Sequence, residues 1–239
     1  MKNIVDCIVF CSGKCGSSTL CHSLRKNNLK CIKIHSKEDF KNVCKDDRKY
    51  RIYNSVNDLI IISSKNKKLY IIDSYRLPIE RKISGFFQNI HIHIQNYKKK
   101  SIEYIIEIFN KEYLCSLENY HSINSILDDY KLENFKNFDF NNRFIKKELN
   151  NLVFIKILFR DINKWDNILS KIFNKKITIY PNNITKYKNY NSLYEEFKKK
   201  YKVPKKFINE YLLNDKEFKI YNTKKEQEEY IKKWLDRSY

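Results

Sequence analysis

The chain has 239 residues, 42% of them hydrophobic, which suits one domain, or one domain with a sizeable insertion, around a substantial core. No stretch approaches the ~20 consecutive apolar residues of a transmembrane helix, so we expect no membrane span. The formal net charge of +20 favours an anionic ligand. The lysines of the chain are spread along its whole length. The contents of lysine, asparagine, isoleucine and tyrosine are all high, as AT-rich coding would produce, so charge alone does not favour a nucleic-acid partner.

The N-terminal residues and the cysteines indicate a reducing compartment. The stretch "MKNIVDCIVFCSGK" lacks the long apolar run and cleavage site of a signal peptide, so we expect a cytoplasmic protein. Six of the seven cysteines precede residue 45, which makes a poor disulfide framework. A zinc site built from Cys7, Cys11 and Cys15 lacks any CxxC pair, so we expect buried thiols and no metal.

Apolar periodicity predicts strands that alternate with helices. The predicted strands cover residues 4–11, 30–36, 58–64, 68–76, 151–160 and 177–183. The predicted helices cover residues 17–27, 78–97, 101–150, 162–173 and three segments after residue 190. This order predicts an α/β fold with a mostly parallel central sheet flanked by helices and a helical C-terminal region.

A glycine-bearing turn follows the first predicted strand. The chain has only three glycines, and two of them, Gly13 and Gly16, fall in "FCSGKCGSSTLCHSL". A turn between a strand and a helix N-terminus presents N–H groups and a positive dipole to an anion. Lys14 adds a charge, and the run Ser17–Thr19 adds hydroxyl donors. The lysine precedes the second glycine, so this is not a Walker A loop. An ordinary capped turn is the alternative.

The third glycine lies in a second candidate phosphate-binding segment, "IIDSYRLPIERKISGFFQNI". Arg76 ends a predicted strand, and Ser84 stands about two turns into the next helix, on the face opposite its apolar stripe. An arginine and a serine placed in this way can together hold one phosphate. The alternative is a solvated helix face.

Both segments resemble the cofactor-binding motifs of sulfotransferases. "SGKCGSSTL" resembles their loop for the 5′-phosphosulfate of PAPS (3′-phosphoadenosine 5′-phosphosulfate), and "RLPIERKISGF" is similar to their R-x-P-x-x-R-x-x-S-x-F motif for the 3′-phosphate. The C-terminal run 183–234 looks like a group of sulfotransferase-like proteins described as capsular polysaccharide synthesis proteins. The resemblance implies one P-loop-like sulfotransferase domain over residues 1–239. Residues 98–150 match weakly and are a candidate helical insertion that binds the acceptor.

The resemblance implies roles for individual residues. Arg76 and Ser84 would hold the 3′-phosphate, and Lys14 would also stabilise charge on the leaving group. The residues expected around the phosphosulfate are Ser12, Gly13, Lys14, Cys15, Gly16, Ser17, Ser18 and Thr19. The acceptor hydroxyl needs a base, for which "IKIHSKEDF" offers His35 and Glu38. A structural or surface role for His35 stays open.

The resemblance therefore implies transfer of a sulfuryl group from PAPS to a hydroxyl of a carbohydrate acceptor. Three alternatives stay open: a nucleotide-dependent phosphotransferase with "YIID" as its Walker B strand, a basic nucleic-acid-binding protein, and an inactive sulfotransferase-like protein. Arg160, at another predicted strand end, could contact the ligand or pair with a neighbouring aspartate. The aromatic run 134–144 could line an acceptor groove, although aromatic core is favoured. His91 and His93 point apart on a helix, which argues against a metal pair.

Overall fold

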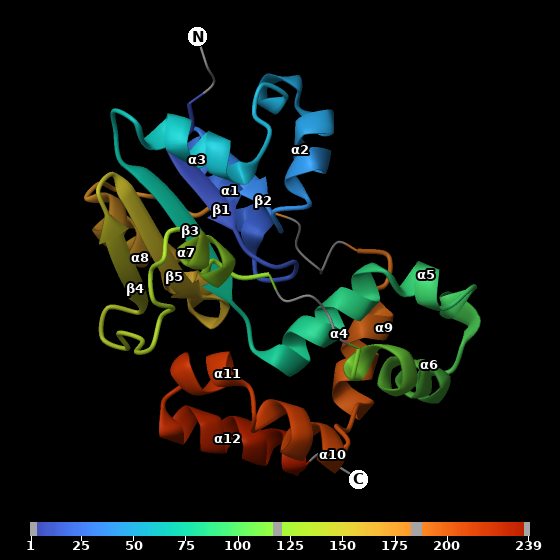
Figure 1. The fold of residues 1–239 in the computed structure, drawn as a ribbon. Helices are drawn as coiled ribbons and strands as arrows, with labels where there is room; N and C mark the ends of the chain where they lie inside the picture. Colours follow the sequence, from blue (N-terminus) through green and yellow to red (C-terminus); the bar gives the residue numbers. More distant parts are fainter. Residues whose placement is uncertain (1–3, 117–120, 183–187, 237–239) are drawn as a thin grey trace. The chain divides into compact units, whose positions relative to one another are not determined.

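The computed structural model describes residues 4–116, 121–182 and 188–236 (Figure 1). The chain forms two compact units, each built from two separate segments of sequence. The first unit comprises Met1–Arg76 and Tyr120–Asn183, and the second comprises Leu77–Asn119 and Ile184–Tyr239. Residues 98–150, the predicted insertion, are therefore divided between the two units.

The first unit contains a five-stranded sheet of order β2-β1-β3-β5-β4. The strands are β1 (Cys7–Phe10), β2 (Cys31–Ile34), β3 (Leu69–Tyr75), β4 (Phe144–Leu149) and β5 (Leu152–Leu158). The neighbours β2, β1, β3 and β5 run parallel, and β4 pairs with β5 antiparallel. The predicted α/β class with a mostly parallel central sheet is confirmed.

Helices cover both faces of this sheet. On one face pack α1 (Ser17–Lys26) and α8 (Trp165–Phe173), the latter preceded by the 3-10 helix η4 (Phe159–Lys164). On the other face pack α2 (Phe40–Asp46), α3 (Val56–Ser64) and α7 (Asn124–Asp129). A short 3-10 helix η1 (Arg48–Tyr50) lies between α2 and α3.

Five cysteines contribute to the core between the sheet and α1. Cys7, Cys11, Cys15, Cys21 and Cys31 are all buried there, and all seven cysteines are free thiols. Burial raises the pKa of the Cys7 and Cys11 thiols well above the ordinary value, which keeps them neutral at pH 7. The prediction that most thiols act as small buried hydrophobic groups is confirmed.

The described part of the second unit is helical. It contains α4 (Pro78–Gln88), α5 (Ile90–His93), η2 (Tyr97–Lys99), α6 (Ile102–Ile108), α9 (Asn191–Lys200), α10 (Lys205–Phe207), α11 (Lys216–Ile220) and α12 (Lys224–Leu235). Two π-helical segments, η3 (Phe109–Leu114) and η6 (Ile208–Leu212), continue α6 and α10. The apolar stripe predicted on α4 is buried in this unit's core, as are Ile90 and Ile94 beyond it.

The prediction of a strand over 58–64 is wrong, because these residues belong to α3. Ser55 caps the helix by accepting the Asp58 N–H at 3.1 Å. The buried positions Val56, Leu59, Ile60 and Ser63 follow helical spacing, whereas Ile61 is 60% exposed. The β-branched run suggested a strand, and one-sided burial determines a helix.

Three further predictions on secondary structure need correction. Residues 144–149, expected to be helical, form the edge strand β4, where pairing with β5 outweighs local preference. Residues 177–182, expected to be a strand, form an irregular segment held by the side chains of Ser23 in α1 and of its C-cap Asn27; residue 183 lies outside the described residues. The helix expected over 78–97 ends at Gln88, where the Asn89 N–H bonds back to the Phe86 carbonyl.

Among the described residues, no helix is both long and apolar enough to cross a membrane.

Candidate functional site

The glycine-bearing turn connects β1 to α1 through two residues in the left-handed region. Lys14 has a φ of 69° and Gly16 a φ of 82°, whereas Gly13 has no positive φ. Gly16 is the N-cap of α1 and offers no side chain to its first turn, which also contains no acidic residue. The positive end of the helix dipole is therefore uncompensated by a local carboxylate, as an anion site requires.

Gly16 is required for steric as well as conformational reasons. A Cβ atom at this position would lie 2.8 Å from the indole of Trp165 and 2.9 Å from the ring of Phe159. Inside the turn, the Cys15 thiol donates to the Gly13 carbonyl at 3.7 Å. Two aromatic rings therefore pack against the turn at Gly16, and a hydrogen bond between Cys15 and Gly13 links two residues of the turn itself.

Arg76, the first residue of the second motif, contacts the glycine-bearing turn within the first unit. Its Nη1 donates a hydrogen bond to the Lys14 carbonyl at 2.9 Å. The same guanidinium lies 4.6 Å from the centre of the Phe159 ring. Because an arginine has five N–H donors in a fixed fork, one bond to the turn leaves the group capable of binding an anion beside it.

The serine and threonine hydroxyls that follow the turn have different partners. Ser18 Oγ accepts from the Lys33 ammonium of β2 at 3.4 Å. The Thr19 hydroxyl donates to the Asn182 carbonyl at 2.9 Å and accepts the Asn182 N–H at 3.2 Å. Ser12 and Ser17 are buried beside the turn. Thr19 thus anchors Asn182, and its predicted contact with a ligand would require breaking those bonds.

The sequence patterns did not identify Lys33 and Phe159 as neighbours of the glycine-bearing turn. Lys33 is the one half-buried polar residue within the buried strand β2, a break in the pattern that could have identified it. Phe159 follows β5 and contributes through packing on Gly16 and Arg76, which no local pattern reveals.

His35 lies next to the base of the turn. Its Nδ1 is 2.8 Å from the carbonyl oxygen of Cys11, the residue that follows β1. A carbonyl oxygen only accepts, so the geometry assigns the proton of the neutral ring to Nδ1 and leaves Nε2 as the basic nitrogen. The Asp39 carboxylate accepts the His35 N–H at 3.1 Å and holds the turn after β2.

Glu38, the other predicted base, has a different environment. Its side chain is exposed. Hydrogen bonds from its own N–H and from the Ser36 hydroxyl hold the pKa of this carboxyl below its ordinary value. A carboxylate of lowered pKa is a weaker base, so the local chemistry favours His35 over Glu38 as a proton acceptor.

Asp73 of "YIID" forms a buried ion pair instead of reaching the surface. Its Oδ2 accepts from the Lys156 ammonium at 2.7 Å and from the Ile123 N–H at 2.9 Å. Both charged side chains are completely buried. A carboxylate occupied in this way is a poor water-mediated ligand for Mg²⁺, which argues against the Walker B interpretation.

The remaining predicted residues are distributed over both units. Ser84 lies half-buried on α4 of the second unit, so its joint role with Arg76 of the first stays a prediction.

Arg160 lies in η4, and the neighbouring Asp161 carboxylate is held by Arg143 at 2.7 and 2.9 Å. His93 stacks on the Phe86 ring at 5.4 Å, and His91 is exposed. In the aromatic run, Phe135 and Phe138 are buried, as the core interpretation predicted.

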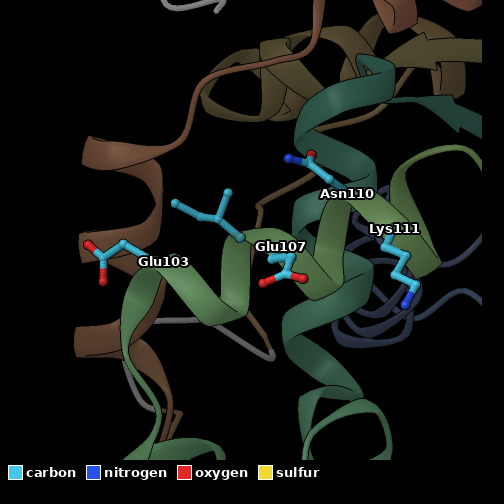
Figure 2. Close-up of a pocket in the computed structure, with 5 residues that line it drawn as sticks. Glu103, Glu107, Asn110 and Lys111 are labelled. Carbon is cyan, nitrogen blue, oxygen red and sulfur yellow. The ribbon is translucent and has the colours of Figure 1, made fainter.

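An open hollow of about 500 Å³ lies on the second unit along α6 and η3. Figure 2 shows its polar side chains on one continuous helical stretch, with Glu103 and Lys111 towards the two ends. Glu103 pairs with Lys200 at 3.4 Å, and Asn110 accepts from the Tyr201 hydroxyl at 2.9 Å.

Within the described ranges, no three His, Cys, Asp or Glu side chains are grouped so that they could hold a metal ion.

Comparison with known proteins adds no assignment. No protein-family model, no curated protein and no solved structure matches the chain. The functional argument therefore rests on the residues and their geometry.

Proposed function

We propose that the chain is a PAPS-dependent sulfotransferase of the P-loop-like type that acts on a carbohydrate hydroxyl. The observation that carries the proposal is the 2.9 Å hydrogen bond from Arg76 to the Lys14 carbonyl. Arg76 and the glycine-bearing turn were separately expected to hold the two ends of one cofactor. Their direct contact supports one binding site for an anionic cofactor at this end of β1 and β3.

In the proposed reaction, the turn binds the 5′-phosphosulfate through the N–H groups at the start of α1 and through Lys14. The acceptor oxygen attacks sulfur in line, the new O–S bond forms, and the S–O bond to the nucleotide phosphate breaks. Negative charge develops on that bridging oxygen, where Lys14 stabilises it. His35 accepts the acceptor's proton at Nε2, because its Nδ1 proton is directed at the Cys11 carbonyl.

The cofactor part is tested by thermal unfolding with adenosine 3′,5′-bisphosphate. We expect the ligand to raise the Tm of the wild type, and to raise it far less in Lys14→Ala and Arg76→Ala. Lys26→Ala is the matched control, because Lys26 is exposed at the other end of α1. No shift in the wild type, or equal shifts in all variants, would sink the cofactor proposal.

The catalytic part is tested by transfer of labelled sulfate from PAPS to a panel of glycans. We expect His35→Gln to lose transfer while it retains the bisphosphate-induced Tm shift, and Glu38→Gln to keep most of the activity. Wild-type protein that binds the nucleotide and transfers nothing would indicate an inactive member. Stabilisation by ATP with Mg²⁺ in place of the bisphosphate would indicate the phosphotransferase alternative.

A further inference from the structure

Residues 177–182 form a strap along α1, the helix that begins at the glycine-bearing turn. Within the strap, Ile177 is buried and Ile179 half-buried, whereas Thr178 and Tyr180 are exposed. This alternation is that of a strand and explains why the sequence predicted one. Among the described residues, however, no strand of the sheet pairs with the strap.

Polar side chains of α1 and of its C-cap take the place of a neighbouring strand. Each of them both donates to the carbonyl and accepts the N–H of one residue of the strap, at distances of 2.8–3.3 Å. The pairs are Asn27 with Thr178, Ser23 with Tyr180, and Thr19 with Asn182.

The spacing of the three pairs matches on the two sides. On the helix they stand four residues apart, about 6 Å along its axis. On the strap they stand two residues apart, about 6.6 Å in an extended chain. The His22 ring of α1 adds an edge contact with the Tyr180 ring, 6.5 Å between centres. The strap is therefore bound along most of α1 through its main chain.

The last of these pairs lies at the end of α1 that would bind an anion. Thr19 is the third residue of the helix and is 6% exposed. The Leu20 N–H bonds back to the Gly16 carbonyl, so the N–H groups of residues 17–19 belong to the open end of the helix. Thr19 can thus present its N–H to an anion while its hydroxyl holds the strap.

The first turn of α1 has little other support from its own cap. The N-cap is Gly16, which has no side chain to accept an N–H from this turn. Glycine also has the greatest backbone freedom of any residue. The two bonds between Thr19 and Asn182 therefore restrain a turn that its N-cap leaves without a side-chain bond.

We propose that the strap positions the anion site: the bound strap holds the first turn of α1 in the conformation that binds the anion, and a bound anion in return holds the strap. The entropy of ordering this turn is lost only once, so whichever binds first favours the other. Ser23 and Asn27 are then positioning residues, which act through the strap. The coupling rests on the anion site of the proposed function and does not depend on sulfate transfer.

The test combines calorimetric titration with amide hydrogen exchange of the full chain. The probes are adenosine 3′,5′-bisphosphate and inorganic pyrophosphate. We expect the bisphosphate to slow exchange of the Thr178 and Tyr180 amides roughly fivefold, although both pair with α1 beyond its first turn. Because coupling between two sites is reciprocal, loss of the strap should weaken the affinity by a similar factor.

Two variants remove bonds of the strap away from the turn. Ser23→Ala removes both bonds to Tyr180, and Thr178→Pro removes the N–H that Asn27 accepts without any change in α1. Each should bind both probes roughly fivefold more weakly. Thr178→Ala is the matched control, because it keeps that N–H and replaces an exposed side chain. It should bind as the wild type does, and circular dichroism checks the folding of every variant.

The coupling is overturned if folded Ser23→Ala and Thr178→Pro bind like the wild type, or if Thr178→Ala loses as much affinity as they do. Unchanged exchange at Thr178 and Tyr180 also overturns it. Faster exchange would show that the ligand displaces the strap from Thr19, the opposite of the proposal. Binding of neither probe would refute the anion site and the coupling together. Strap-dependent binding without sulfate transfer would refute the proposed function alone.

Discussion

The guanidinium of Arg76 donates from Nη1 to the main-chain carbonyl of Lys14, across 62 positions of sequence. The bond joins the end of β3 to a turn in which Lys14 itself has a left-handed φ of 69°. A side chain proposed to bind one anionic group of the cofactor thereby also holds the backbone proposed to bind the other. Loss of Arg76 should therefore affect both stability and ligand binding.

Replacement of Arg76 by lysine keeps the charge and loses the planar fork. We expect Arg76→Lys to lower the free energy of unfolding by about 1–2 kcal/mol, because the bond to Lys14 and the stacking on Phe159 are both lost. Urea denaturation measures this loss. A double-mutant cycle with Phe159→Leu should give a coupling of about 0.5–1 kcal/mol, and strict additivity would contradict the stacking contribution.

The two glycines of the turn should respond differently to replacement by alanine. Gly16→Ala places a Cβ within 3 Å of Trp165 and Phe159 and strains a φ of 82°, so we expect about 1–3 kcal/mol of destabilisation. Gly13→Ala is the matched control, because a Cβ there meets nothing within 4 Å and φ is not left-handed. Thermal unfolding of both variants measures the difference, and equal losses would show that the packing against Gly16 is unimportant.

The buried ion pair between β3 and β5 should be costly to break and inexpensive to remove. Lys156→Met leaves the Asp73 carboxylate buried without its cation, and we expect a loss of about 3–5 kcal/mol. The double variant Asp73→Asn/Lys156→Met should recover a large part of this loss, because no uncompensated charge remains. Chemical denaturation of the single and double variants tests the expectation, which fails if the double variant is the less stable.

The stability of the second unit should depend on the titration of Asp215. Burial raises the pKa of Asp215, so the folded state holds the proton more tightly than the unfolded state. Between the ordinary carboxyl pKa of 3.8 and the raised value, stability therefore falls as the pH rises. Asp215→Asn keeps a side chain that can cap α11 and should remove this part of the pH dependence. Tm measured against pH for both proteins tests this, and identical profiles would contradict it.

The candidate site was predictable where a local pattern carries the chemistry. The positions of Gly13 and Gly16 between a strand and a helix identified the turn, and a strand-end arginine identified Arg76. The contact between Arg76 and the Lys14 carbonyl was not predictable, because it depends on the left-handed path of the turn. The proton position on His35 likewise depends on a carbonyl contributed by another strand.

The sequence by itself determined the α/β class, the parallel strands β1, β2, β3 and β5, and the buried stripe of α4, because apolar spacing records which face is covered. Only the tertiary structure decided that residues 56–64 form a helix and that 144–149 form an edge strand. In both segments the local pattern favours the other structure, and burial on one side or pairing with β5 determines the outcome. The role of Asp73 also depends on tertiary structure. Its partner Lys156 lies 83 positions away, and only the pairing of β3 with β5 brings the two residues opposite each other.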